Sequence, residues 1–159
     1  MKLYVASPLG FSEAGREFYT GVLIPKLAAL GLDILDPWAL TDGDRIAAVA
    51  RLAYGAERRE AWRKLSIEIG RNNAGAIEAC DAVLAVLDGT DVDSGTAAEI
   101  GYACALGKKI VGYRGDFRLA ADNEGTTVNL QVEYFIRQSG GTVVTELAGI
   151  PGALRDIGL

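Results

Sequence analysis

The chain has 159 residues, of which half are apolar and 23% are charged, and its net charge is −5. This length and composition fit a single folded domain over residues 1–159, long enough to bury one core around a sheet. The 16 Lys and Arg residues look scattered on an acidic chain, which argues against a nucleic-acid polymer as partner. Histidine is absent, which excludes a Ser-His-Asp triad and most transition-metal sites, so no metal is expected.

The cysteines and the apolar segments indicate the cellular compartment of the protein. Cys80 and Cys104 have no C-x-x-C spacing, which favours separate structural thiols over a disulfide or a metal pair. The N-terminal apolar run is too short for a signal peptide, and no segment approaches the roughly 18 apolar residues of a membrane span. We therefore expect a cytoplasmic protein without membrane contact.

The first predicted strand is Lys2–Ala6, and Ser7-Pro8 stops it. The loop after it has neither the G-x-G-x-x-G dinucleotide motif nor the G-x-x-x-x-G-K-[ST] phosphate loop, so no cofactor is expected. A helix is predicted from about Glu13 to Leu30, kinked by Pro25 and ended by Gly31. The residues predicted to face inward from it are Phe18, Val22, Leu23, Leu27 and Leu30.

A second strand is predicted at Leu32–Asp36, and Trp38 follows it at the same edge of the sheet. Trp38 has two interpretations, which are ordinary packing and a wall against which a nucleobase stacks. Residues 42–80 have a helical pattern that is broken near Gly55. Within this region Asn72-Asn73 interrupts the helix-forming residues, which indicates either a local helix break or a contact with substrate.

The third predicted strand, Ala82–Leu87, leads into an acidic loop and then a helix that contains Glu99 in its first turn. Thr96-Ala97-Ala98-Glu99 matches a capping box, in which the glutamate only accepts a backbone N–H. The alternative is functional, because an ionised carboxylate near the positive end of a helix, at the carboxyl end of a strand, can act as a nucleophile. Asp93 adds a second carboxylate, and displacement at a sugar anomeric carbon requires such a pair. Asp88 is either a turn former or a substrate contact.

The remaining elements complete an alternating pattern. A strand at Lys109–Tyr113, a polar loop to Thr127, a helix capped by Asn129 and a strand at Thr142–Thr145 follow in order. The pattern predicts an α/β fold, a flavodoxin-like three-layer sandwich whose five-stranded parallel sheet has the order 2-1-3-4-5. The switch point of this order lies between the first and third strands, which brings Tyr4 beside the loop before Glu99.

Three separated motifs are similar to one known family. They are residues 3–9 (Leu-Tyr-Val-Ala-Ser-Pro-Leu), residues 88–103 (Asp-Gly-Thr-Asp-Val-Asp-Ser-Gly-Thr-Ala-Ala-Glu-Ile-Gly-Tyr-Ala) and residues 128–136 (Val-Asn-Leu-Gln-Val-Glu-Tyr-Phe-Ile). In this order they resemble the nucleoside 2-deoxyribosyltransferases over nearly the whole chain. The resemblance implies transfer of a 2-deoxyribosyl group between purine or pyrimidine bases, through a covalent intermediate on a glutamate.

The same resemblance implies roles for single residues. Glu99 would attack C1′, Tyr4 would touch and orient Glu99, and Asp93 would bind the substrate and assist proton transfer. Asn73 matches a position that contacts the base. Asn129 matches one that reaches into a neighbouring subunit and holds the sugar, so a homo-oligomer with shared sites is expected.

The expected partners are a 2′-deoxynucleoside and a free nucleobase. Trp38, Asp88, Ser94 and Gly95 are the further candidates for substrate contacts. The apolar run Val132–Ile136 either belongs to a subunit interface or packs on its own sheet.

Two other functions stay open. A relative with the same fold hydrolyses 2′-deoxynucleoside 5′-monophosphates, and its phosphate needs a cradle that Ser94-Gly95-Thr96 with Arg114 or Arg118 could supply. The Asn129-Leu130-Gln131 motif instead resembles the transferases, which favours unphosphorylated nucleosides. The other alternative is a non-catalytic nucleotide-sensing module, against which the intact pair of Asp93 and Glu99 argues.

Overall fold

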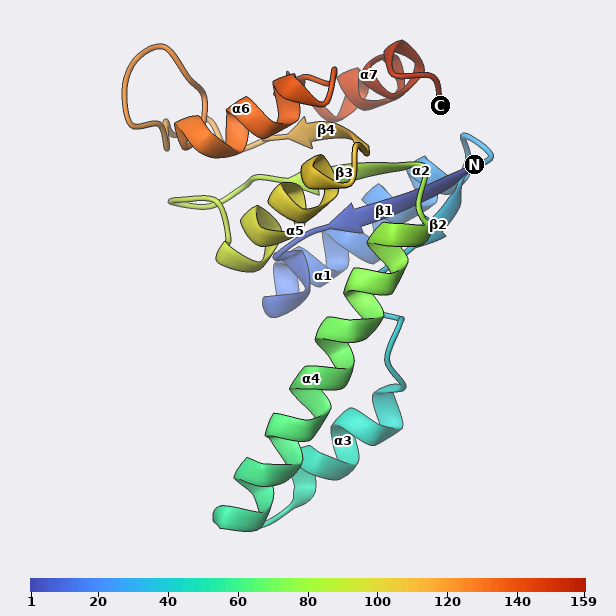
Figure 1. The fold of residues 1–159 in the computed structure, drawn as a ribbon, viewed down its shortest axis with the longest axis vertical. Coiled ribbons are helices and arrows are strands. Elements are labelled where there is room, and N and C mark those ends of the chain that lie inside the picture. Colours follow the sequence, from blue (N-terminus) through green and yellow to red (C-terminus); the bar gives the residue numbers. More distant parts are fainter.

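The computed structural model describes residues 1–159 and contains one five-stranded parallel sheet. The strands are β1 (Lys2–Ala6), β2 (Asp33–Leu35), β3 (Ala82–Val86), β4 (Lys109–Tyr113) and β5 (Val143–Val144). Their order is β2-β1-β3-β4-β5, so the predicted flavodoxin-like order is confirmed (Figure 1). Because all neighbours pair in parallel, the carboxyl ends of all strands lie at one edge.

Helices cover both faces of this sheet. Those on one face are α4 (Ala56–Ala79), α5 (Ser94–Ala105) and α6 (Leu130–Gln138). Those on the other face are α1 (Glu13–Phe18), α2 (Ile24–Ala28) and α7 (Ile150–Asp156). Side chains alternate along β1, so Tyr4 and Ala6 enter the first core while Leu3 and Val5 enter the second. Every residue of β3 is buried, as expected of a central strand with both faces covered.

The helix predicted over residues 13–30 is divided by a π-helical turn, Tyr19–Leu23, between α1 and α2. The turn precedes Pro25, which has no N–H to continue the helical hydrogen bonds. The wider turn rotates the inward face, so the predicted burial of Val22 and Leu30 is wrong, and Tyr19 is buried instead. Gly31 ends the helix with a φ of 78°, as predicted.

α3 (Gly43–Arg51) and α4 form a helical hairpin that is broken around Gly55, as predicted. In Figure 1, α3 and the lower part of α4 project away from the sheet; residues 43–66 are called the arm below. α4 continues without a break through Asn72 and Asn73, so the predicted local break is wrong. The Asn72 amide donates to Thr41 Oγ1 at 3.1 Å, a tertiary contact that offsets its poor helix propensity. None of the helices combines the length and apolar character needed to cross a bilayer.

A glycine is required at position 141, where the chain enters β5 against the backbone of β4. A Cβ at Gly141 would lie 1.7 Å from the carbonyl oxygen of Ile110. We expect Gly141→Ala to lower the free energy of unfolding by about 3 kcal/mol, the upper end of the usual cost of overpacking. Gly75→Ala is the matched control, because an added carbon inside α4 meets no atom within 4 Å. It should raise the same free energy by up to about 1 kcal/mol. Urea titrations followed by circular dichroism measure both, and two small effects of the same sign would contradict this account.

Candidate active site

A cavity of about 300 Å³ lies at the carboxyl edge of the sheet, where open α/β sheets bind ligands. Its wall is formed by the loops after β1, β2 and β3, by the start of α5, by α3 and by the middle of α4. The volume is at the lower end of the range for small-molecule sites, roughly 300–1,000 Å³. No three His, Cys, Asp or Glu side chains lie close enough together to hold a metal ion.

Glu99 in the cavity wall joins three elements of the fold. The Tyr4 hydroxyl, from β1, donates to Glu99 Oε1 at 2.7 Å. The Asn73 amide, from α4, donates to the same oxygen at 3.4 Å. Glu99 Oε2 accepts no hydrogen bond from the chain, so one oxygen of an oriented carboxylate is free to react.

The start of α5 corrects the capping-box interpretation. Asp93 is the N-cap residue, and its Oδ2 accepts from the Thr96 backbone N–H at 3.0 Å. The helix begins at Ser94, so Glu99 lies in its second turn, not in its first. Since Glu99 points to Tyr4, it is free of the capping role, and Asp93 both caps the helix and lines the cavity.

Opposing effects set the pKa of Glu99. Burial raises it, the hydrogen bond from Tyr4 lowers it, the Asp93 carboxylate raises it and the Asn73 amide lowers it, with a net upward shift. The pKa of Tyr4 is also raised, first by burial and then by its hydrogen bond to Glu99. The Tyr4 hydroxyl therefore stays protonated and acts as a donor over the whole physiological range.

Asn73 has a second unusual atom besides its donor. Its Oδ1 is buried and has no hydrogen-bond partner in the chain. A buried acceptor without a partner costs free energy, so a donor from a bound ligand would stabilise this side chain.

Trp38 packs against its own chain and also lines the cavity, so stacking on a nucleobase stays a prediction. Its ring N–H donates to the Ser7 carbonyl at 3.2 Å, and its ring meets Phe11 edge-on with centroids 4.8 Å apart. A Cβ at Gly10 would lie 2.2 Å from the Trp38 ring, so this packing needs a glycine there. Trp38 is still 40% exposed and lines the cavity, as Gly95 does.

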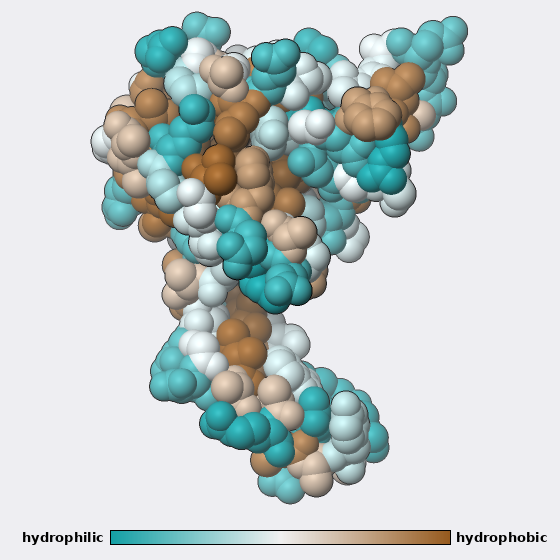
Figure 2. Space-filling model, turned by 180° about the vertical axis from the view of Figure 1, so that it is seen from behind, coloured by the Kyte–Doolittle hydropathy of each residue, from teal (hydrophilic) through white to brown (hydrophobic).

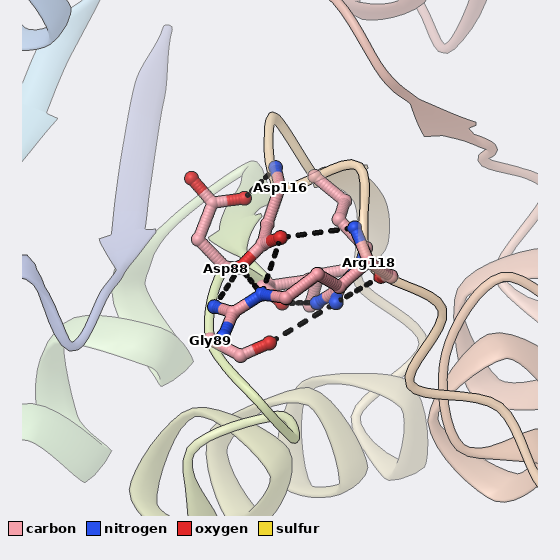
Figure 3. Close-up of polar contacts among 6 residues, drawn as sticks. Asp88, Gly89, Asp116 and Arg118 are labelled. Atoms are coloured by element: carbon pink, nitrogen blue, oxygen red, sulfur yellow. Dashed lines mark hydrogen bonds and ion pairs between the residues drawn. The ribbon is translucent and has the colours of Figure 1, made fainter.

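Four predicted residues lie outside the cavity wall, and one of them, Tyr4, reaches it through its hydrogen bond to Glu99. Asp88 Oδ1 accepts from the Asp116 N–H at 2.9 Å, in a polar cluster after β3 and β4 (Figure 3). Ser94 is the exposed first residue of α5. Asn129 is the N-cap of α6, as predicted, with Oδ1 accepting from the N–H groups of Gln131 at 3.0 Å and Val132 at 3.4 Å.

The sequence analysis missed other wall residues. They are Phe11, Thr41, Ile46 and Ile69, with Ser7 and Pro37. Ile46 and Ile69 come from α3 and α4, and apolar residues at helical spacing look like ordinary core positions in a sequence. The only signal in the sequence is the break near Gly55, which indicates two helices that can pack side by side and bring Ile46 and Ile69 together.

These features define a class of site. A partly aromatic cavity without a basic residue in its wall holds two carboxylates, one of which has a free oxygen, at the switch point of a doubly wound sheet. Such a site can bind a small uncharged ligand and form a covalent bond to it.

Comparison with known proteins agrees with this class. A model of the nucleoside 2-deoxyribosyltransferase family matches residues 3–131. The chain belongs to this family. No curated protein matches it in sequence.

Three solved structures are similar to this one. A conserved protein from Enterococcus faecalis V583 has 26% identity and a TM-score of 0.71, covering 98% of this chain and 97% of that one. The 2-desoxiribosyltransferase from Leishmania mexicana has 26% identity and a TM-score of 0.62, covering 97% and 94%. A Clostridium botulinum CMP N-glycosidase shares the fold, with 15% identity and a TM-score of 0.55, covering 98% and 99%.

The contact between Tyr4 and Glu99 makes a direct prediction. Tyr4→Phe removes a hydrogen bond that lowers the pKa of Glu99, so that pKa should rise above its already raised value. NMR titration of carboxyl-labelled glutamate measures it. Tyr102→Phe is the matched control, since it removes a tyrosine–glutamate hydrogen bond to Glu78 on the surface. An unchanged or lower Glu99 pKa in Tyr4→Phe would contradict the described geometry.

Proposed function

We propose that the protein transfers 2-deoxyribosyl groups between nucleobases by two displacements at C1′. The observation that carries the proposal is the partly buried Glu99 carboxylate, oriented by the Tyr4 hydroxyl at 2.7 Å and left with one free oxygen in the cavity wall. Family membership supports the same chemistry.

The first displacement forms a bond between a Glu99 oxygen and C1′. The bond from C1′ to the base nitrogen breaks, its electron pair leaves with the base, and Asp93 assists the proton transfer that neutralises the base. In the second displacement a nitrogen of the incoming base attacks C1′ and gives up its proton by way of Asp93, and the C1′–O bond to Glu99 breaks to restore the carboxylate. Two easier steps thereby replace one difficult step.

The rest of the wall suits a nucleobase. Trp38 and Phe11 offer aromatic surface, and the unpaired Oδ1 of Asn73 can accept an N–H from the base. Ile46 and Ile69 add apolar surface from α3 and α4.

The structure favours a nucleoside without a 5′-phosphate. No Lys or Arg lines the cavity. Arg114 is buried on backbone carbonyls and Arg118 pairs with Asp116, so neither serves as the phosphate cradle considered from the sequence. The Asp93 carboxylate also occupies the N-terminus of α5, which is the usual anion-binding position of a helix.

A substrate comparison tests the reaction class. Deoxyinosine, deoxyinosine monophosphate and inosine are supplied separately, with and without adenine, and deoxyadenosine and hypoxanthine are quantified. We expect deoxyadenosine from deoxyinosine with adenine, faster than hydrolysis, and little from inosine. Faster cleavage of the monophosphate without deoxyadenosine would assign the protein as a hydrolase, and binding without any base release would assign a sensing module.

Glu99→Gln should lower transfer by about a thousand-fold or more, because the amide cannot form the glycosyl ester. The amide still accepts from Tyr4, and Asp93 remains the cap of α5, so folding should be unchanged. Glu78→Gln is the control for an exposed glutamate. Mass spectrometry after incubation with deoxyinosine alone should show a deoxyribosyl adduct on the peptide with Glu99 in the wild type only. Comparable rates in Glu99→Gln and wild type would overturn the assignment.

We further propose a homo-oligomer in which Asn129 completes the site of a neighbouring subunit. Its place outside the cavity wall of its own chain supports this role. The run Val132–Ile136 contributes little, because Val132 and Ile136 are buried in their own core and only Tyr134 is largely exposed.

The arm is the stronger candidate for the interface. It carries six of the 16 basic residues but three of the 21 acidic ones, so the basic residues are less scattered than the sequence suggested. Tyr54 is 93% exposed, and Ile67, just beyond the arm, is 64% exposed. Figure 2 shows the arm from behind with apolar patches among charged side chains. A basic arm complements the acidic remainder of a second copy and repels another arm.

Reversing the charge of the arm should therefore weaken association. We expect Arg58→Glu with Arg59→Glu to raise the dissociation constant at least about tenfold, since two attractive contacts become repulsive. Lys26→Glu with Arg155→Glu is the control with the same change in net charge on the opposite face of the sheet. Sedimentation velocity measures both variants. An active wild-type monomer, or equal effects of the two pairs, would contradict the proposed interface.

A further inference from the structure

Arg114 is a buried cation that the proposed reaction does not use. It follows β4, is 1% exposed, and donates to three backbone carbonyls. Its Nη1 donates to the Leu87 carbonyl, and its Nη2 donates to the carbonyls of Gly89 at 3.0 Å and Arg118 at 2.7 Å. Figure 3 shows this cluster between the two loops.

Burial of a guanidinium group adds little net stability to a protein. Removing a charge from water costs several kcal/mol, about what its charge-assisted hydrogen bonds return, and an apolar side chain of similar volume often stabilises a protein equally well. What an apolar side chain cannot do is hold carbonyls of two different loops. The distinctive effect of Arg114 is therefore to fix the segment after β3 against the segment after β4.

A second contact joins the same two segments. Asp88 Oδ1 accepts from the Asp116 N–H at 2.9 Å. Asp116 in turn pairs with Arg118, whose hydrogen bonds hold the pKa of the Asp116 carboxyl well below its usual range. Both loops are thus tied by side chains as well as by the β3–β4 pairing.

We propose that Arg114 is a positioning residue for the proposed glycosyl transfer. It fixes the path on which the chain leaves β3, four residues before Asp93 caps α5. Tyr4 is held independently, since its backbone pairs with Leu35 and Val83 in neighbouring strands. A displaced β3–α5 segment would therefore move Asp93 and Glu99 relative to Tyr4.

The test compares Arg114→Met, Arg114→Lys and the control Arg155→Met, an exposed arginine on α7. With deoxyinosine and adenine, Arg114→Met should lower kcat about 10- to 100-fold and change KM less than about threefold, as expected of a small misplacement of reacting groups. Arg114→Lys keeps the charge but not the forked geometry, so its kcat should lie between those of Arg114→Met and the wild type. Arg155→Met should match the wild type.

Two further measurements separate positioning from a loss of stability. The pKa of Glu99 depends on its burial and on its distances to Tyr4 and Asp93, so the acid limb of the kcat profile should shift in Arg114→Met. Amide hydrogen exchange of residues 88–96 should accelerate while that of β1 stays unchanged. An unchanged acid limb with unchanged exchange, or a rise in KM alone, would overturn the proposal.

The proposal rests on the proposed function only for its kinetic part. A wild type without base release or transfer would refute that function, while hydrogen exchange in the variants would still decide whether Arg114 holds the segment. Should Arg114→Met not fold, Asp88→Ala removes the second contact between the loops and should give the same pattern in weaker form. Wild-type exchange and kcat in Asp88→Ala and Arg114→Lys would then overturn the proposal.

Discussion

The site depends on one hydrogen bond between residues 95 positions apart, from the Tyr4 hydroxyl to Glu99 Oε1. It exists because β1 and β3 are neighbours in the sheet, with Tyr4 in register with Val83. The same packing buries Glu99, which raises its pKa, and supplies the donor that opposes the rise. Burial by itself favours the neutral form of a carboxylate, and the Tyr4 donor opposes this by favouring the charged form that can act as a nucleophile.

The strands and their order could be predicted because apolar runs bounded by breakers are local signals. The start of α5 could not, because Asp93 and Thr96 are both good caps and lie three residues apart. Which of the two residues caps α5 depends on tertiary contacts of the segment between β3 and α5, where the Gly89 carbonyl accepts from Arg114. The inward face of residues 13–30 was predicted in part, because Leu23 and Leu27 are buried as expected, whereas the π turn before Pro25 exposes Val22 and buries Tyr19.

The residues of the candidate site also divide into those that the sequence could predict and those that it could not. Glu99, Asp93, Tyr4 and Asn73 could be singled out because few residue types carry chemistry, and family motifs marked their positions. The wall residues Ile46 and Ile69 could not, since apolar residues in helices mostly belong to a core. Arg114 was considered only as part of a phosphate cradle, because an arginine within a polar loop is usually solvated, and its burial on three carbonyls could not be predicted.

The lack of histidine has a consequence for any titration of this protein. No side chain has an ordinary pKa near neutrality, and burial shifts the pKa of the Glu99 carboxylate upward. A change in rate, spectrum or ligand affinity that titrates above the ordinary range of carboxylates therefore has few candidates other than Glu99. The titration of Glu99 therefore reports directly on the wall of the cavity.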